Sequence, residues 1–221
     1  MSSNHSVAIN GGEVLDQYRG MQLRAKADRQ SMRRIRFAPV LGIAIATSPD
    51  NRLVDNALAF ASAYLHHTDY TDGKHGRESA RLLGTDPPAE SKALDHTADK
   101  RLFRWSMAGL AVRHARRGQF KRSGTIAAVG IGCAIRDHFN VQMRSQAEVE
   151  DINVGSRDIG RAKTALFALT QTLETSSLGA QETDVSQFLD HAMVGVAGLS
   201  VASHVDMSMH IAAEREARML A

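Results

Sequence analysis

The hydrophobic residues of this chain gather in six stretches, which polar or charged segments separate. The stretches cover residues 35–47, 53–65, 102–112, 125–135, 164–173 and 188–202. Alanine is abundant within them, and they lack the strict alternation of apolar and polar residues that is typical of a half-buried strand. The four prolines, Pro39, Pro49, Pro87 and Pro88, are expected at the starts of elements or in loops. The pattern predicts an all-α protein with six helices.

These stretches are short for a membrane protein. None contains the roughly 20 apolar residues that a helix needs to cross a bilayer, and Asn56, Ser62, Ser106 and Gln171 interrupt several of them. The mean hydropathy of −0.26 favours a soluble protein. A hydrophobic content of 43% suits either a soluble helical protein or a modest membrane protein. Hydropathy by itself therefore leaves both classes open.

Charge and cysteine content indicate which partners and which cellular compartment suit the chain. The net charge of +3 and the isoelectric point near 9.2 fit binding to anionic lipid headgroups or to nucleic acid equally well. The single cysteine, Cys133, excludes an intramolecular disulfide framework and favours a reducing cytoplasm. Residues 1–30 are polar and lack the apolar core of a secretory signal. We expect a polar N-terminal segment over 1–30, a helical domain over 31–209 and a charged tail over 210–221.

Four aspartates between residues 68 and 100 are the most distinctive chemical feature. Asp69 and Asp72 are three residues apart, and Asp95 and Asp99 are four apart. If each pair lies on a helix, its two carboxylates project from one face, so two helices can build one metal site. Gly73 lets a phosphate come close to the first pair. The spacing therefore predicts metal-assisted phosphate chemistry, with the planar guanidinium of Arg77 available to bind a phosphate.

The residues around the two pairs resemble the signature of the CDP-alcohol phosphatidyltransferases, integral membrane enzymes of phospholipid synthesis. The matching elements are Asp69-x-x-Asp72-Gly73-x-x-Gly76-Arg77 and Asp95-x-x-x-Asp99. Residues 94–100 look most like the phosphatidylglycerophosphate synthase branch. The chain departs from the usual pattern at Gly76, where the family commonly has Ala, and at Ser91, where it has Gly. The spacer between Arg77 and Ser91 is also several residues longer than usual.

Weaker matches extend the resemblance along the chain. Arg34, five residues before Pro39, is similar to an arginine and a proline of the family's first helix. Residues 131–137 resemble its Gly-Arg-Glu element, and residues 159–164 resemble its Gly-Lys-x-Lys-Thr element. Their order and spacing agree with those of the family.

The resemblance implies a six-helix membrane bundle with its active site facing the cytoplasm. It implies transfer of a phosphatidyl group from CDP-diacylglycerol to a small alcohol, expected to be glycerol 3-phosphate, with release of CMP. Mg²⁺ or Mn²⁺ would bind Asp69, Asp72, Asp95 and Asp99, and Asp99 would also act as general base. The remaining assignments are Thr68, Gly73, Gly76 and Arg77 for the CDP moiety and Arg136, Arg161 and Lys163 for the acceptor's phosphate. Membrane lipid is an expected partner, homodimerisation follows from the resemblance alone, and no nucleic-acid partner is expected.

Two alternatives remain open at this level. A divergent, non-catalytic member of the family would keep the aspartates, while Ser91 and the long spacer would displace the nucleotide site. A soluble, basic helical protein that binds a polyanion or a partner is favoured by the low hydropathy and by the cations of residues 113–122. That run would also lie outside the cytoplasm if the aspartates lie inside, against the positive-inside rule, whereas the loop 136–163 agrees with it. The low aromatic content, 5%, and the lack of a DNA-binding helix motif argue against nucleic acid.

Overall fold

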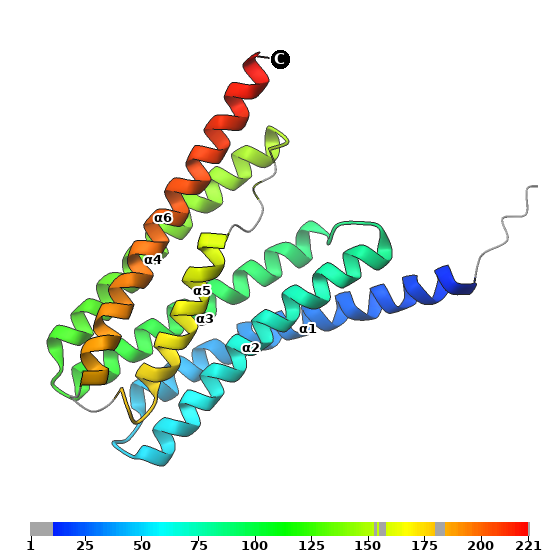
Figure 1. Ribbon diagram of the computed structural model, residues 1–221. Coiled ribbons are helices and arrows are strands. Elements are labelled where there is room, and N and C mark those ends of the chain that lie inside the picture. The colour runs from blue at the N-terminus through cyan, green and yellow to red at the C-terminus, as the bar shows by residue number, and fades with distance from the viewer. Residues whose placement is uncertain (1–10, 153, 155–157, 180–183, 221) are drawn as a thin grey trace, which may run out of the picture. The chain divides into compact units, whose positions relative to one another are not determined.

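The computed structural model describes residues 11–152, 154, 158–179 and 184–220, and the described chain is helical (Figure 1). Its six helices are α1 (Gly11–Thr47), α2 (Arg52–Leu83), α3 (Ala89–Arg116), α4 (Phe120–Val149), α5 (Asp158–Thr175) and α6 (Asp184–Leu220). These described residues contain no β-strand. The prediction of an all-α protein with six helices is confirmed.

Local chemistry sets several of the helix ends. Asn51 begins α2 as an N-cap, because its side-chain oxygen accepts the backbone N–H groups of Leu53 at 2.9 Å and Val54 at 3.3 Å. Gly84 follows α2 with a φ of 62°, and Gly118 follows α3 with a φ of 76°. Residues with a side chain rarely adopt this left-handed backbone, so glycine lets the chain turn there.

All six helices are longer than their apolar stretches indicated. The apolar run 35–47 is only the last part of α1, and Pro39 therefore lies inside that helix. The prediction that Pro39 marks the start of an element was wrong, because polar residues before it are also helical. In the same way α2 and α3 continue beyond the runs 53–65 and 102–112. Polar turns of helix carry no apolar signal, so hydrophobic stretches underestimate helix length.

The chain divides into two compact units, each formed by parts of several helices. The first unit consists of Met1–Phe37 and Leu65–Arg101, of which 11–37 and 65–101 are described. In it α1 and α2 pack closely at Gly20, whose carbonyl oxygen accepts a hydrogen bond from Ser79 Oγ at 2.8 Å. A Cβ at Gly20 would lie 2.8 Å from the side chain of Leu83, so a larger residue there would force that side chain to move. This first unit contains all four aspartates of the signature.

The second unit consists of Ala38–Tyr64 and Leu102–Ala221, within which α6 packs against α4 and α5 (Figure 1). Apolar residues such as Leu110, Leu189 and Met193 are fully buried in it. Polar groups are buried there too. The amide nitrogen of Gln171 on α5 donates hydrogen bonds of 2.8 Å to the hydroxyls of both Ser62 on α2 and Ser106 on α3. These three polar residues, which interrupt the apolar stretches, join three helices from inside.

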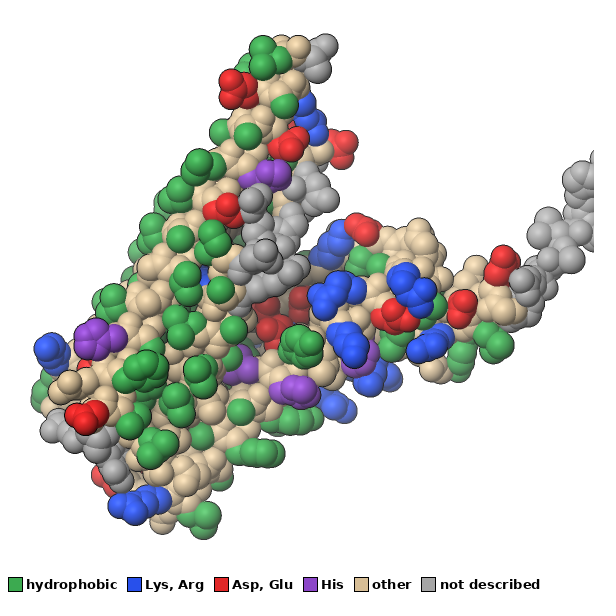
Figure 2. Space-filling view, in the orientation of Figure 1, with side chains coloured by type: hydrophobic (Ala, Val, Ile, Leu, Met, Phe, Trp, Pro, Cys, Tyr) green, Lys and Arg blue, Asp and Glu red, His purple; other side chains and the backbone are tan. Residues whose placement is uncertain are grey.

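The second unit exposes many large hydrophobic side chains on its surface. Its large exposed hydrophobic residues include Val40, Ile43, Phe60, Ile131, Ile135, Phe188, Val194 and Val201. Figure 2 shows hydrophobic side chains along the visible face of α6. Large continuous apolar surfaces are uncommon on soluble monomers and are typical of contacts with lipid or protein. The second unit therefore buries several polar groups and exposes many apolar side chains.

Although many apolar side chains are exposed, few of the described helices have the length and composition needed to cross a bilayer. Among the described residues, α6 alone is long and apolar enough to cross a bilayer, and 28% of its apolar window is buried. The bundle of six membrane-spanning helices stays a prediction.

Glycines let α1 and α3 touch through their backbones in the second unit. A Cβ on Gly42 would lie 2.5 Å from the carbonyl oxygen of Trp105, and a Cβ on Gly109 would collide with the carbonyl oxygen of Gly42. Because backbone atoms cannot rotate away, we expect Gly109→Ala to destabilise the protein by about 2–3 kcal/mol. Thermal or denaturant unfolding measures this loss.

Gly132→Ala is the matched control for this substitution. Gly132 lies in α4, and a Cβ there would meet no atom within 4 Å. The substitution should leave stability unchanged or raise it by up to about 1 kcal/mol, because alanine favours helix over glycine. Equal stabilities of the two variants would show that α1 and α3 do not cross at these glycines.

Candidate functional site

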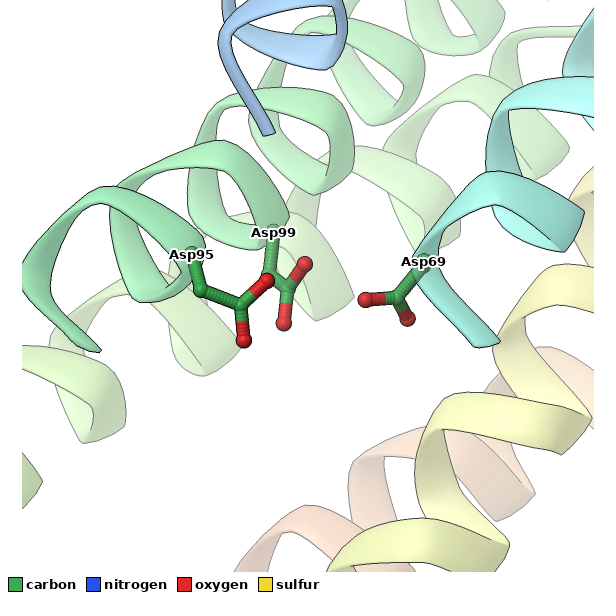
Figure 3. Close-up of side chains that lie close together, drawn as sticks. All are labelled: Asp69, Asp95 and Asp99. Atoms are coloured by element: carbon green, nitrogen blue, oxygen red, sulfur yellow. The ribbon is translucent and has the colours of Figure 1, made fainter. Parts of the chain in front are cut away.

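The four aspartates of the signature meet within the first unit. Asp69 and Asp72 lie on α2, and Asp95 and Asp99 lie on α3, so each pair occupies a helix, which is the condition under which its spacing places both carboxylates on one face. Figure 3 shows Asp69 directed from α2 toward Asp95 and Asp99 on α3. One carboxylate oxygen from each of these three lies within 4.8 Å of the others. We call Asp69, Asp72, Asp95 and Asp99 the aspartate cluster.

Arg34 of α1 contacts every member of the aspartate cluster. Its Nη1 donates to Asp69 Oδ1 at 2.6 Å and to Asp99, and its Nη2 donates to Asp95 Oδ1 at 2.7 Å and to Asp72. Each nitrogen thus bonds one carboxylate from α2 and one from α3. The Arg34 side chain has no exposed surface. One guanidinium therefore ties the two acidic helices together.

Ser31, one helical turn before Arg34, adds a further polar contact to Asp72. The Ser31 hydroxyl lies 3.2 Å from Asp72 Oδ2 and 3.3 Å from Asp95 Oδ1, and it also accepts from Arg34 Nη2. Asp72 itself is only 3% exposed, and its second oxygen, Oδ1, is buried without a hydrogen-bond partner. A buried carboxylate oxygen without a partner costs free energy that a bound cation can recover.

The aspartate cluster holds more negative charge than Arg34 neutralises. Burial raises the pKa of Asp72 to about 7, although Arg34 opposes the shift. Partial burial, followed by the charge of Asp69, raises the pKa of Asp99 well above its usual value. Burial alone would lower the pKa of Arg34, but the four carboxylates outweigh it and raise that pKa. Both shifts mean that the ionised carboxylates are disfavoured where they lie, and a further positive charge nearby would oppose these shifts.

These residues fit a divalent cation. Carboxylate oxygens are the ligands that Mg²⁺ and Mn²⁺ prefer. The cluster offers four carboxylates from two helices, and three of them already lie close enough to share one ion. The unpartnered oxygen of Asp72 adds an acceptor that the protein leaves unused.

The residues expected at the CDP moiety surround the first aspartate pair. A Cβ at Gly76 would meet no atom within 4 Å, and one at Gly73 would meet only the guanidinium of Arg77 at 3.5 Å. The side chain of Arg77 is exposed, so it is accessible to a phosphate beside these glycines. Thr68 differs, because it is buried and its hydroxyl donates to the carbonyl oxygen of Leu65 at 2.7 Å. Gly73, Gly76 and Arg77 therefore offer an open surface, and Thr68 does not.

The residues expected at the acceptor's phosphate belong to the second unit. Arg136 pairs with the adjacent Asp137 at 2.5 Å, and the pair is mostly buried. The side chain of Arg161 lies outside the described residues. The roles of Arg136, Arg161 and Lys163 stay predictions.

The basic run 113–122 is largely bound within the protein. Arg113 pairs with Asp55 at 2.7 Å, and both side chains are almost fully buried. Glu174 is fully buried between His114, 3.0 Å away, and Arg122, 2.7 Å away. From the sequence alone this run looks like a charged surface. Its acidic partners, Asp55 and Glu174, are about 50 or more residues away along the chain. Arg113 and Arg122 are therefore engaged inside the protein, whereas Arg116 and Lys121 of the same run are exposed.

Sequence reasoning missed the central position of Arg34 and the role of Ser31. Arg34 appeared only as a weak match to a family position, and nothing in its neighbourhood indicated a contact with four aspartates. The contacts join residues 35 to 65 positions apart, which local spacing cannot reveal. No family model, curated protein or solved structure matches this chain.

Proposed function

We propose that this protein is a metal-dependent CDP-alcohol phosphatidyltransferase. It transfers a phosphatidyl group from CDP-diacylglycerol to a small alcohol, glycerol 3-phosphate being the expected acceptor, and releases CMP. The observation that carries the proposal is the convergence of Asp69, Asp72, Asp95 and Asp99 from two helices on one point. These are the four acidic positions of the signature that the sequence resembles.

The aspartate cluster would hold Mg²⁺ or Mn²⁺. A divalent cation bound there would neutralise the pyrophosphate of CDP-diacylglycerol and stabilise the charge that develops on the CMP leaving group. Gly73 and Gly76 would allow the CDP moiety to approach the α2 backbone, and the exposed guanidinium of Arg77 would bind one of its phosphates.

Asp99 would act as the general base. Its raised pKa makes its carboxylate a stronger base than an ordinary aspartate. Asp99 would accept the hydroxyl proton of the acceptor alcohol as the alcohol oxygen forms a bond to the β-phosphorus. The bond between that phosphorus and the oxygen of CMP would break in the same displacement. Asp69 and Asp95 would hold the cation beside it.

The surface of the second unit supports an integral membrane location. Exposed residues such as Phe60, Phe188 and Val201 would face lipid, whereas buried Gln171 and Glu174 would be shielded by the helices around them. Polar groups inside and apolar groups outside are what a bilayer requires of a helical protein. A lipid substrate also requires access from the membrane. We therefore propose that the second unit is embedded in the bilayer and that the aspartate cluster faces the cytoplasm.

We expect the protein to sediment with membranes and to remain there after a wash at 1 M NaCl. Apolar contact does not weaken with salt, whereas binding through cations to a polyanion does. Immunoblotting of the washed pellet and of a detergent extract measures the distribution. Recovery in the soluble fraction, or release by salt alone, would contradict the membrane location and favour a soluble basic protein.

A divergent, non-catalytic member of the family is the second candidate. The observation that favours it is the guanidinium of Arg34, which already places a positive charge among all four aspartates. In this candidate the cluster is an ion-pair network that joins three helices, with a binding role for the protein. It predicts a folded protein with no CMP release.

The experiment that separates the two candidates measures CMP release from CDP-diacylglycerol in detergent micelles with Mg²⁺. Glycerol 3-phosphate, inositol phosphate and serine are compared as acceptors, each with and without EDTA. Release that needs both an acceptor and the cation would establish the transferase. If folded protein releases no CMP with any of the three acceptors, the non-catalytic candidate is favoured.

A further inference from the structure

We propose that Arg34 is a positioning residue that serves as an internal counter-cation for the aspartate cluster and competes with the divalent cation for its carboxylates. Without the cation, Arg34 holds the four aspartates together. When the cation binds, Arg34 gives up these contacts. This inference rests on the proposed metal-dependent function, and it adds a role for a residue that neither binds substrate nor transfers a proton.

The geometry of the contacts is the first argument. Arg34 takes one oxygen from each aspartate, and its two terminal nitrogens divide them evenly between α2 and α3. The same carboxylates are the only ligands that the cluster offers a metal. Because a guanidinium and a divalent cation repel each other strongly at such short range, the two cannot share the cluster without a large penalty.

The incomplete fit of Arg34 is the second argument. Asp72 Oδ1 and Arg34 Nε are both buried without a hydrogen-bond partner, although they belong to residues in direct contact. Arg34 thus leaves polar atoms of the cluster unpaired and supplies one positive charge to four carboxyl groups. Because buried polar atoms without partners cost free energy, a divalent cation that pairs with these carboxylates can replace Arg34.

A purely structural role for Arg34 predicts the opposite response. If Arg34 only kept the aspartates in position, its removal would scatter them and weaken metal binding. If Arg34 competes with the metal, its removal frees the carboxylates and strengthens binding. The direction of the change in metal affinity therefore separates the two roles.

The test measures Mn²⁺ binding to purified, detergent-solubilised protein from the loss of the electron paramagnetic resonance signal of free Mn²⁺. Arg34→Met removes the charge while keeping a long side chain, and we expect it to lower the dissociation constant at least about tenfold. Arg34→Lys keeps a positive charge but makes fewer hydrogen bonds. Its dissociation constant should lie between those of the wild type and Arg34→Met. Arg33→Met is the matched control, because Arg33 is an exposed neighbour on the same helix, and its dissociation constant should equal that of the wild type.

Thermal unfolding provides a second readout on the same proteins. In EDTA, Arg34→Met should unfold at a lower temperature than the wild type, since four carboxylates then lack their counter-cation. Added Mn²⁺ should raise its unfolding temperature more than that of the wild type. If Arg34→Met does not fold even with Mn²⁺, Arg34→Lys and Arg34→Gln provide the comparison.

The outcomes distinguish this inference from the proposed function. An unchanged or higher dissociation constant in the Arg34 variants would overturn the competition, even if the wild type binds Mn²⁺ and releases CMP. If neither the wild type nor any variant binds Mn²⁺, the metal site itself is wrong and the proposed function fails with it. Tighter binding in Arg34→Met, with Arg33→Met unchanged, would establish the competition.

Discussion

Asp99→Asn is expected to lower the rate of CMP release by a factor of about a thousand or more. A positioned general base typically contributes about 10²–10⁴ in rate, and the same substitution removes a charged ligand of the metal. Asparagine has nearly the same shape as aspartate, and it relieves the repulsion from Asp69 that raises the pKa of Asp99. The variant should therefore remain folded in EDTA. Steady-state kcat for CMP release, measured beside the unfolding temperature, separates lost chemistry from lost structure.

Asp72→Ala should lower the same rate to a similar extent, because it removes the most deeply buried member of the aspartate cluster. Asp86→Asn is the matched control. Asp86 lies in the same unit, but its carboxylate is 87% exposed and pairs with Lys92 at the surface. It should retain the wild-type rate. Retention of more than about a tenth of the activity by both Asp99→Asn and Asp72→Ala would contradict the proposed site, given the contribution expected of a general base.

Glu174→Ala is expected to destabilise the protein by about 3–5 kcal/mol, the usual cost of removing one partner of a buried ion pair. Glu174 is fully buried, and its two oxygens contact His114 at 3.0 Å and Arg122 at 2.7 Å. Alanine would leave the Arg122 guanidinium nearly buried without its main countercharge and remove the hydrogen-bond acceptor of His114. Glu174→Gln, which keeps an acceptor, should lose less. Denaturant unfolding in a constant detergent measures both changes.

Glu150→Ala is the control for this prediction. Glu150 forms two hydrogen bonds of 2.6 Å with Arg215, a geometry as good as that of Glu174, but the pair is exposed to solvent. Water screens such pairs, so the substitution should change stability little. Equal losses in the free energy of unfolding for Glu150→Ala and Glu174→Ala would show that burial does not set the contribution of Glu174 to stability.

Much of the candidate site could be predicted because its signal is local. Wherever these residues are helical, the spacing of Asp69 with Asp72, and of Asp95 with Asp99, places each pair on one face of its helix. The structure bears out that part, since both pairs lie on helices and face each other. Their use in metal binding and catalysis stays a prediction.

Helix boundaries were harder to predict, because the polar parts of a long helix resemble loops. Pro39 looked like the start of an element since an apolar run begins near it. The residues before it are polar, yet they are helical and pack in the first unit, so Pro39 lies well inside α1. Tertiary contacts make such turns stable, and a hydrophobic pattern does not record them.

The sequence by itself determined the helical class, the six helices and the pairing of aspartates along two of them. These properties depend on residues within a few turns of each other. Only the tertiary structure decided that Arg34 stands among the four aspartates and that Glu174 is enclosed by His114 and Arg122. A charge looks the same in a sequence whether it is solvated or buried. Its surroundings are set by chain segments dozens of residues away, and the cost of burying it is met only when those segments fold together.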